Sequence, residues 1–177
     1  MSAVFVQQII DGKIDEWASQ VVNIYDLTKK DTGFWFIIDT KGALKGKLHS
    51  CRRFEMCRDV VVLVSKSTPK AYLDHLKERN YGFHVVGNDK ADLRKSLMLI
   101  MEEYGVRTVL TDTGRILSNL LLEQGLADEI SLLVHPVIVG RKSYRIFDGL
   151  RKGIRLEMLE EKRMGKGYVW LNYGVSR

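Results

Sequence analysis

Four polar residues in the middle of the sequence have types and spacing that suit the binding of an anion. Asp112, Thr113, Gly114 and Arg115 follow an apolar segment and precede a segment with helical periodicity. Glycine lets the backbone approach a phosphate closely, threonine offers a hydroxyl and an N–H, and arginine can bind two phosphate oxygens. Because a helix start also presents unpaired N–H groups, we expect a dinucleotide pyrophosphate as the ligand.

The same four residues also have a purely structural interpretation. Asp112 or Thr113 would cap the helix, and Gly114 would supply the turn before it, as these residue types do at most helix starts. The spacing alone leaves the cap and the binding site as alternatives.

The elements that must position this segment alternate between strand and helix. Helical spacing predicts helices after a Ser67-Thr68-Pro69 start signal, after a cap at Asp89, and after Gly114. Apolar runs rich in aromatic and β-branched residues predict strands at 34–39, 59–65, 83–87, 106–111 and 129–134, with helices at 71–79, 91–104 and 115–123. This order predicts an α/β fold of three layers, α/β/α, with a mostly parallel central sheet.

The last part of the sequence has a different pattern. From Ile154 onward apolar residues recur with a period of two, on both sides of a turn at 164–167. This pattern predicts a C-terminal antiparallel hairpin that closes the sheet. The length of 177 residues predicts one domain over residues 1–177.

The charge balance favours anionic partners. Lys and Arg number 28 against 22 Asp and Glu, and the sequence pI is about 9.3. The basic residues are scattered, with no aromatic residues interleaved along a groove, so we expect no nucleic-acid partner. We also expect no membrane partner and a cytoplasmic location, because no apolar run reaches the roughly 18 residues of a spanning helix and the start does not resemble a signal peptide.

The residues that commonly bind metals are too far apart to form a site. Cys51 and Cys57 lack a second pair or a nearby histidine, so we expect two free thiols and no metal. The four histidines are dispersed, and we interpret the one in the apolar segment, His135, as structural or as a subunit contact. Neither cysteine has a base partner at a readable spacing.

Three consecutive motifs resemble a known family. They are the segment Gly105–Leu121 with its Asp-Thr-Gly-Arg core, the segment Gly125–Ile130, and the segment His135–Gly140. Their order and spacing resemble the riboflavin-pathway pyrimidine reductases, the C-terminal reductase domain of the bifunctional deaminase-reductase. The resemblance implies a dihydrofolate-reductase-like fold and covers residues 34–175 in the order of the elements.

The resemblance also implies a reaction. Members of this family use NADPH to reduce the ribosyl group of a ribosylaminopyrimidine 5′-phosphate to a ribityl group. Such an enzyme needs no metal, because the cofactor supplies the hydride and the protein positions the reactants. The family further implies a homodimer, for which the apolar strand 130–139 and the C-terminal hairpin offer surface.

The resemblance assigns site residues by position. Thr113, Gly114, Arg115 and Ile116 would contact the cofactor pyrophosphate. Ser65, Lys66 and Ser67 would contact the adenosine ribose and its 2′-phosphate, with helix capping as the alternative. Gly87 would line the same cleft or only end a strand. Asp11 in the Asp-Gly-Lys turn would position the substrate, and Lys13 and Asp39 would bind it.

The sequence departs from the family in two places. It lacks the Val-Gly-x-x-Thr motif expected before residue 34, and Thr113 and Arg115 stand where the family commonly has small residues. Three hypotheses therefore remain open. They are an NADPH-dependent pyrimidine reductase, a non-catalytic cofactor-binding relative, and a basic module that binds nucleic acid or protein.

Overall fold

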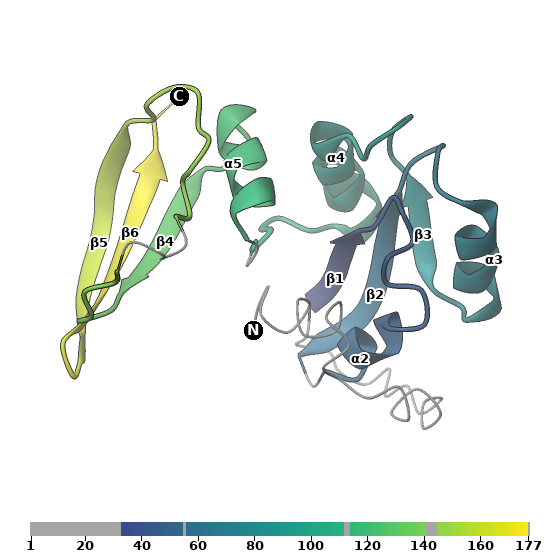
Figure 1. Cartoon of the computed structure of the whole chain (residues 1–177), viewed down its shortest axis with the longest axis horizontal. Helices are drawn as coiled ribbons and strands as arrows, with labels where there is room; N and C mark the ends of the chain where they lie inside the picture. Colours follow the sequence, from purple (N-terminus) through teal and green to yellow (C-terminus); the bar gives the residue numbers. More distant parts are fainter. Residues whose placement is uncertain (1–32, 55, 112–113, 141–144, 177) are drawn as a thin grey trace. The chain divides into compact units, whose positions relative to one another are not determined.

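The computed structural model describes residues 33–54, 56–111, 114–140 and 145–176. The chain divides into two compact units, Met1–Leu110 and Thr111–Arg177, which are called the first and the second unit below. Figure 1 shows the helices and strands of each unit. Whether the two units act as one domain stays a prediction.

The first unit is built on a parallel sheet. Its strands are β1 (Gly33–Ile38), β2 (Cys57–Val64) and β3 (Gly82–Val85), in the order β1-β2-β3. Both pairs are parallel, with Ile37 opposite Val62 and Val62 opposite Phe83. Helices α2 (Leu48–Arg52), α3 (Lys70–Glu78) and α4 (Leu93–Tyr104) connect and cover the strands (Figure 1). The predicted α/β fold with a parallel sheet is confirmed.

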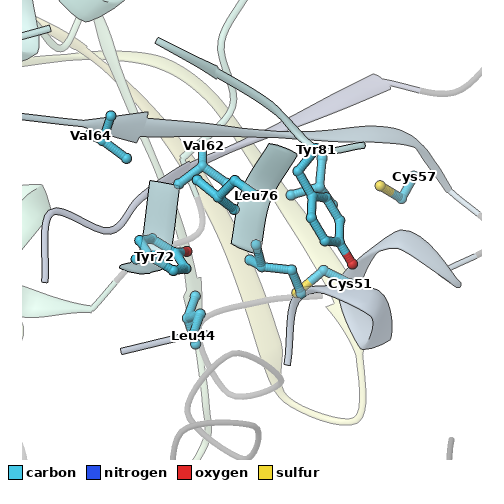
Figure 2. Close-up of a cluster of buried hydrophobic side chains, with 10 residues drawn as sticks. Leu44, Cys51, Cys57, Val62, Val64, Tyr72, Leu76 and Tyr81 are labelled. Carbon is cyan, nitrogen blue, oxygen red and sulfur yellow. The ribbon is translucent and has the colours of Figure 1, made fainter. Parts of the chain in front are cut away.

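The side chains of β2 divide the core of the first unit between the two faces of the sheet. Val60, Val62 and Val64 are fully buried in a cluster with residues of α2 and α3, of which Figure 2 shows a part. Leu63 belongs to a separate cluster with Ile100 of α4. Since successive side chains of a strand point to opposite faces, α4 covers one face and α2 and α3 cover the other. The three predicted layers are therefore present in the first unit.

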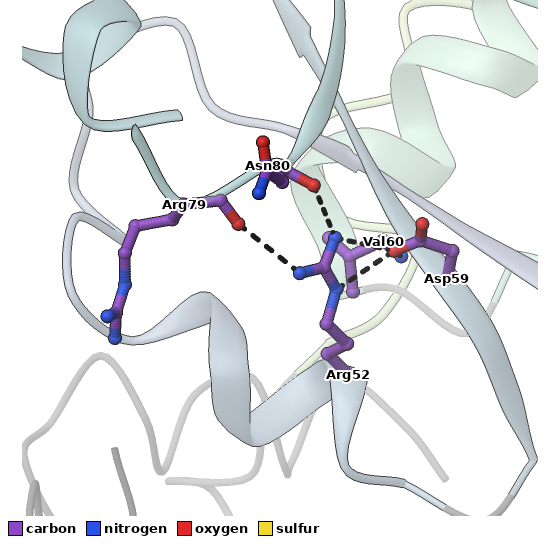
Figure 3. Close-up of polar contacts among 5 residues, drawn as sticks. All are labelled: Arg52, Asp59, Val60, Arg79 and Asn80. Atoms are coloured by element: carbon purple, nitrogen blue, oxygen red, sulfur yellow. Dashed lines mark hydrogen bonds and ion pairs between the residues drawn. The ribbon is translucent and has the colours of Figure 1, made fainter. Parts of the chain in front are cut away.

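Arg52 ties the end of α2 to the sheet and to the turn after α3. Its guanidinium binds the Asp59 carboxylate, with Nε and Nη2 both 3.0 Å from Oδ1. It also donates to the carbonyl oxygens of Asn80 at 2.8 Å and Arg79 at 3.4 Å (Figure 3). The same group lies 4.2 Å from the ring centre of Tyr81. One side chain thus joins three elements that are distant in the sequence.

The second unit contains helix α5 (Arg115–Glu123) and an antiparallel sheet. Strands β4 (Glu129–Val134), β5 (Leu156–Gly165) and β6 (Tyr168–Val175) are ordered β4-β6-β5. The predicted C-terminal hairpin is confirmed as β5 and β6, but it pairs with β4 in a second sheet and does not join the described strands of the parallel sheet. The prediction that 129–134 continues a parallel sheet is wrong, because β4 pairs antiparallel with β6. Its alternation of Glu129, Ile130, Ser131 and Leu132 suits a strand with one polar face.

The prediction of a strand at 106–111 is wrong. The segment forms no ladder with any described strand, and Leu110 is 88 % exposed. An apolar, β-branched segment forms a strand only where a neighbouring edge supplies hydrogen-bond partners, and the sequence does not specify that edge.

Two predicted helix starts are also displaced. Asp92, not Asp89, caps α4, and its carboxylate accepts a hydrogen bond from the Lys95 N–H at 3.0 Å. The Ser67-Thr68-Pro69 start signal precedes α3, but the N-cap is Pro69, which makes no side-chain cap hydrogen bond, and neither Ser67 nor Thr68 occupies that position. None of the described helices is long and apolar enough to cross a membrane.

Candidate functional site

A cluster of hydroxyl groups closes the loop at the carboxyl end of β2. The Ser65 and Ser67 hydroxyls are 3.0 Å apart, and both lie within hydrogen-bonding distance of the Asp89 carbonyl oxygen, at 3.3 and 3.0 Å. Thr68 accepts a hydrogen bond from the Ser65 N–H at 3.0 Å. Ser65 is only 1 % exposed, so its hydroxyl serves the loop, whereas Ser67 is exposed.

Lys66 lies between these two serines, and hydrogen bonds to the loop after β3 hold its backbone in place. Its N–H donates to the Gly87 carbonyl at 2.9 Å, and the Ser67 N–H donates to the Asn88 carbonyl at 3.0 Å. The loops after β2 and β3 are therefore bonded to each other along the carboxyl edge of the parallel sheet. The Lys66 side chain is exposed and can reach an anion in solvent from this rigid support.

Gly87 is required by a close approach within the loop after β3. A Cβ atom at this position would overlap the Lys90 carbonyl and come within 3.1 Å of the Asp92 nitrogen. The loop folds back here so that the Asp92 N–H can donate to the Val86 carbonyl at 2.9 Å. Gly87 therefore lets the loop that supports Lys66 and Ser67 close, and a contact with cofactor stays a prediction.

Asp39 lies at the carboxyl end of β1 and holds the next loop. Its carboxylate accepts hydrogen bonds from the N–H groups of Ala43 at 3.0 Å and Leu44 at 2.8 Å, and the residue is 6 % exposed. Burial, and then the charge of Asp39 and its side-chain hydrogen bond with Tyr72, raise the pKa of the buried Tyr72. The structure gives Asp39 a role in shaping this loop, and its contact with substrate stays a prediction.

The first turn of α5 begins at a glycine. Gly114 is the N-cap, with φ −73° and ψ 177°, and as a glycine it supplies no side-chain cap of its own. The first N–H groups of a helix have no partner within it and attract anions. Ile116 in this turn is 75 % exposed. Among the described residues, α5 therefore starts in the manner expected of a phosphate-binding helix.

Three side chains of α5, one turn apart, bind the segment at 148–151. The Arg115 Nη1 atom lies 3.1 Å from Oδ2 of Asp148, and the Asn119 amide donates to the Asp148 carbonyl at 2.7 Å. The Glu123 carboxylate binds Nε and Nη2 of Arg151 at 3.1 and 3.3 Å, and the Arg151 N–H at 3.0 Å. Hydrogen bonds from Arg151 lower the pKa of Glu123. These contacts, the α5 clamp, fix the segment along one face of the helix.

The structure thus brings the predicted site residues together in two groups. Ser65, Lys66, Ser67 and Gly87 meet at the carboxyl edge of the parallel sheet in the first unit, while Gly114, Arg115 and Ile116 form the first turn of α5 in the second. Asp39 belongs to the first unit but to the loop after β1. The predicted site residues Asp11, Lys13 and Thr113 lie outside the described residues.

Sequence reasoning missed two residues of these groups. Asp89 contributes through its backbone carbonyl, which no side-chain pattern reveals. Asp148 contacts a residue 33 positions away in the sequence. The sequence indicated only the helical half of these contacts. Three polar residues of the predicted helix recur at four-residue spacing and therefore share one face: Arg115, Asn119 and Glu123.

No group of metal-binding side chains occurs among the described residues. Cys51 and Cys57 are buried and form no disulfide. Burial raises the pKa of the Cys51 thiol to about 11, so this thiol lacks the low pKa of a reactive cysteine.

The fold and the two groups define a class of protein. In α/β proteins with parallel strands, ligands bind beyond the carboxyl ends of the strands and at helix starts, and nucleotides are the usual ligands there. A family model described as the RibD C-terminal domain matches residues 16–170. The chain therefore belongs to the RibD C-terminal domain family, a riboflavin-pathway reductase family.

Two solved structures support the same fold. A pyrimidine reductase-like protein from Corynebacterium diphtheriae matches with a TM-score of 0.66 and 14 % identity, over 81 % of this chain and 61 % of that one. RibD from Acinetobacter baumannii matches with a TM-score of 0.61 and 20 % identity, over 80 % of this chain and 37 % of that one. This chain therefore spans less than two thirds of the length of either protein.

Proposed function

We propose that the chain is an NADPH-dependent reductase of riboflavin biosynthesis. Its substrate would be a ribosylaminopyrimidine 5′-phosphate, whose ribosyl group is reduced to ribityl. The observation that carries the proposal is the start of α5 at a glycine N-cap, Gly114, followed directly by Arg115, within a chain that belongs to the RibD C-terminal domain family. Family membership alone leaves the cofactor and the substrate open.

The first turn of α5 fits a pyrophosphate. Glycine at the N-cap leaves the backbone accessible and takes none of the helix N–H groups for itself. Arg115 adds a guanidinium at the first helical position, where its side chain is 39 % exposed. We propose that these N–H groups and Arg115, together with Thr113, hold the pyrophosphate of the cofactor.

The loop after β2 fits the 2′-phosphate that distinguishes NADPH from NADH. Lys66 and Ser67 are exposed there, and two backbone hydrogen bonds to the loop after β3 fix their positions. An ammonium group and a hydroxyl are suitable partners for a phosphate monoester. We assign selection of NADPH to these two side chains, with Ser65 and Gly87 supporting the loop.

The remaining residues of the proposal concern the substrate. NADPH, when bound, supplies the hydride that goes to C1 of the ring-opened ribose. In our proposal Asp11 positions the substrate, and Lys13 and Asp39 contribute to its binding. Asp39 would do so through the loop at 40–47, which its carboxylate holds in place.

A charge placed at the start of α5 tests the cofactor assignment. Gly114→Asp introduces a carboxylate where the phosphate would bind, and we expect NADPH affinity to fall by about tenfold or more. The backbone angles at Gly114 suit any residue, and aspartate is a good N-cap, so helix stability should hold or increase. Gly114→Asn is the matched control, because it has the same shape without the charge.

Nicotinamide fluorescence measures the binding of NADPH to the three proteins. Weaker binding by Gly114→Asp than by Gly114→Asn supports the assignment. No binding of NADPH by the unmodified protein would rule out both a reductase and a non-catalytic cofactor-binding relative. A basic module that binds nucleic acid or protein would then be the remaining hypothesis.

We further propose a homodimer formed through the antiparallel sheet. Opposite pairs on one face are apolar, with Ile130 facing Tyr173 and Leu132 facing Leu171, while the neighbouring pair Ser131 and Asn172 is polar. Gel filtration of the full chain should give the mass of a dimer, and a strict monomer at high concentration contradicts this. A cytoplasmic location is part of the proposal and agrees with two buried cysteines that form no disulfide.

A further inference from the structure

We propose that Asp148 sets the affinity of the α5 start for anionic ligands, by holding the Arg115 guanidinium that a phosphate would otherwise bind. The inference rests on the proposed function, because it takes the first turn of α5 as the place where a dinucleotide phosphate binds. Asp148 acts through Arg115 and is therefore a positioning residue of this site.

The position of the Asp148 carboxylate is fixed by more than the ion pair. Its backbone carbonyl accepts a hydrogen bond from the Asn119 amide at 2.7 Å, and Asn119 is only 9 % exposed. The next residue, Gly149, has φ +106°, a backbone conformation that other residues rarely adopt. Arg151 binds Glu123 at the other end of the segment. The Asn119 hydrogen bond and the turn at Gly149 therefore hold the Asp148 side chain next to the first turn of the helix.

The sign of the effect follows from the charges. A carboxylate 3.1 Å from the Arg115 guanidinium neutralises the cation at the helix start and also repels an incoming phosphate. At a separation of about 7 Å in a water-like medium, one unit of repulsion changes affinity by about threefold. A pyrophosphate carries more than one charge, so removing the carboxylate charge should strengthen binding by about three- to tenfold.

The ion pair is weak enough for a phosphate to displace the carboxylate. The side chains of Arg115 and Asp148 are 39 % and 53 % exposed, and ion pairs with such exposure contribute little to stability. The segment keeps its other two attachments, through Asn119 and Glu123, when Arg115 changes partner. Binding of the anion therefore replaces Asp148 at the Arg115 guanidinium without releasing the segment from α5.

The test compares neutral variants of two carboxylates in the α5 clamp, Asp148 and Glu123. Asp148→Asn removes the charge next to the helix start, and Asp148→Ser repeats this with a smaller side chain. Glu123→Gln removes an equal charge from the other end of α5, about 12 Å along the axis and beyond the screening length of about 8 Å at physiological salt. Asp148→Glu retains the charge and should bind as the unmodified protein does.

Titration with NADPH and, separately, with inorganic pyrophosphate gives the affinities. We expect both ligands to bind Asp148→Asn and Asp148→Ser about three- to tenfold more tightly, and to bind Glu123→Gln and Asp148→Glu with unchanged affinity. In turnover, the KM for NADPH should fall while kcat stays the same. A purely structural role for Asp148 predicts weaker binding in the neutral variants and no such KM change.

The outcomes separate this inference from the proposed function. Equal or weaker pyrophosphate binding by both neutral Asp148 variants overturns the inference, and so does equal tightening by Glu123→Gln. Absence of pyrophosphate binding by every protein overturns it as well. Tighter pyrophosphate binding by the neutral variants, with no NADPH binding by any protein, supports the inference and contradicts the proposed function.

Discussion

Replacement of Arg52 by alanine should be among the most destabilising single changes outside the apolar core. The side chain is 13 % exposed and binds the Asp59 carboxylate and two carbonyl oxygens (Figure 3). It also stacks on Tyr81. Hydrogen bonds to charged groups contribute about 1.5–3 kcal/mol each, and a cation over an aromatic ring contributes about 0.5–2 kcal/mol. These terms are not additive, and Asp59 is 34 % exposed, so we expect a total loss of about 2–4 kcal/mol.

Two further variants test how much of the loss comes from the planar guanidinium of Arg52 and from its burial, and how much from its charge alone. Arg52→Lys keeps the charge but cannot reproduce the hydrogen bonds to Asp59 and the two carbonyls together, so we expect about half the loss. Arg151→Ala removes an arginine that also binds a carboxylate but is 83 % exposed, and we expect a loss within about 1 kcal/mol. Urea unfolding followed by circular dichroism measures all three. A loss below about 0.5 kcal/mol for Arg52→Ala would refute the reasoning.

The remaining predictions concern the loops at the carboxyl edge of the parallel sheet. Gly87→Ala should destabilise the first unit by about 1–3 kcal/mol, because the new methyl group overlaps the Lys90 carbonyl. A free energy of unfolding in urea equal to that of the unmodified protein would contradict this. Burial, and then the charges of Lys45 and Arg79, lower the pKa of His75, whose Nε2 accepts a hydrogen bond from the Gly46 N–H at 3.2 Å. As the pH falls, His75 is protonated in the unfolded chain before it is protonated in the folded protein. The stability contributed by neutral His75 is therefore present above the ordinary histidine pKa and is lost as the pH falls below it. His75→Gln should flatten the fall in stability between about pH 7 and 5, and an unchanged pH profile counts against this role.

The parallel sheet could be predicted because its strands are continuous apolar runs. Val60 to Val64 has five consecutive apolar residues, which only a strand covered on both faces tolerates, and α2, α3 and α4 supply that cover. Helix α2 was not predicted, because five residues are too few for a readable periodicity. Buried Leu48 and Cys51 hold it in place, so tertiary packing and not local preference determines it.

The pairing of strands could not be predicted to the same extent. The apolar content of 106–111 and of β4 predicted a strand in both places, but it does not specify which other strand each would pair with. The first segment has no partner among the described strands, and the second pairs antiparallel with β6. Pairing depends on contacts between residues that are far apart in the sequence. The periodicity of apolar residues within one segment gives no information on those contacts.

The candidate site divides in the same way. Gly114 and Arg115 were readable because a helix start has a local signature, and the structure places both there. The burial of Ser65 and the contact between Arg115 and Asp148 were not, because both depend on segments brought together by the fold. The sequence therefore predicted where an anion would bind but not which groups surround it.

The oxidation of NADPH in the presence of a ribosylaminopyrimidine 5′-phosphate tests the central claim most directly. Loss of the absorbance of the reduced nicotinamide, measured with the purified full chain, should depend on both compounds and should be slower for Gly114→Asp than for Gly114→Asn. The product should carry a ribityl group in place of the ribosyl group. NADPH binding with no consumption of NADPH when the substrate is added would contradict the claim and indicate a relative that binds the cofactor without turnover.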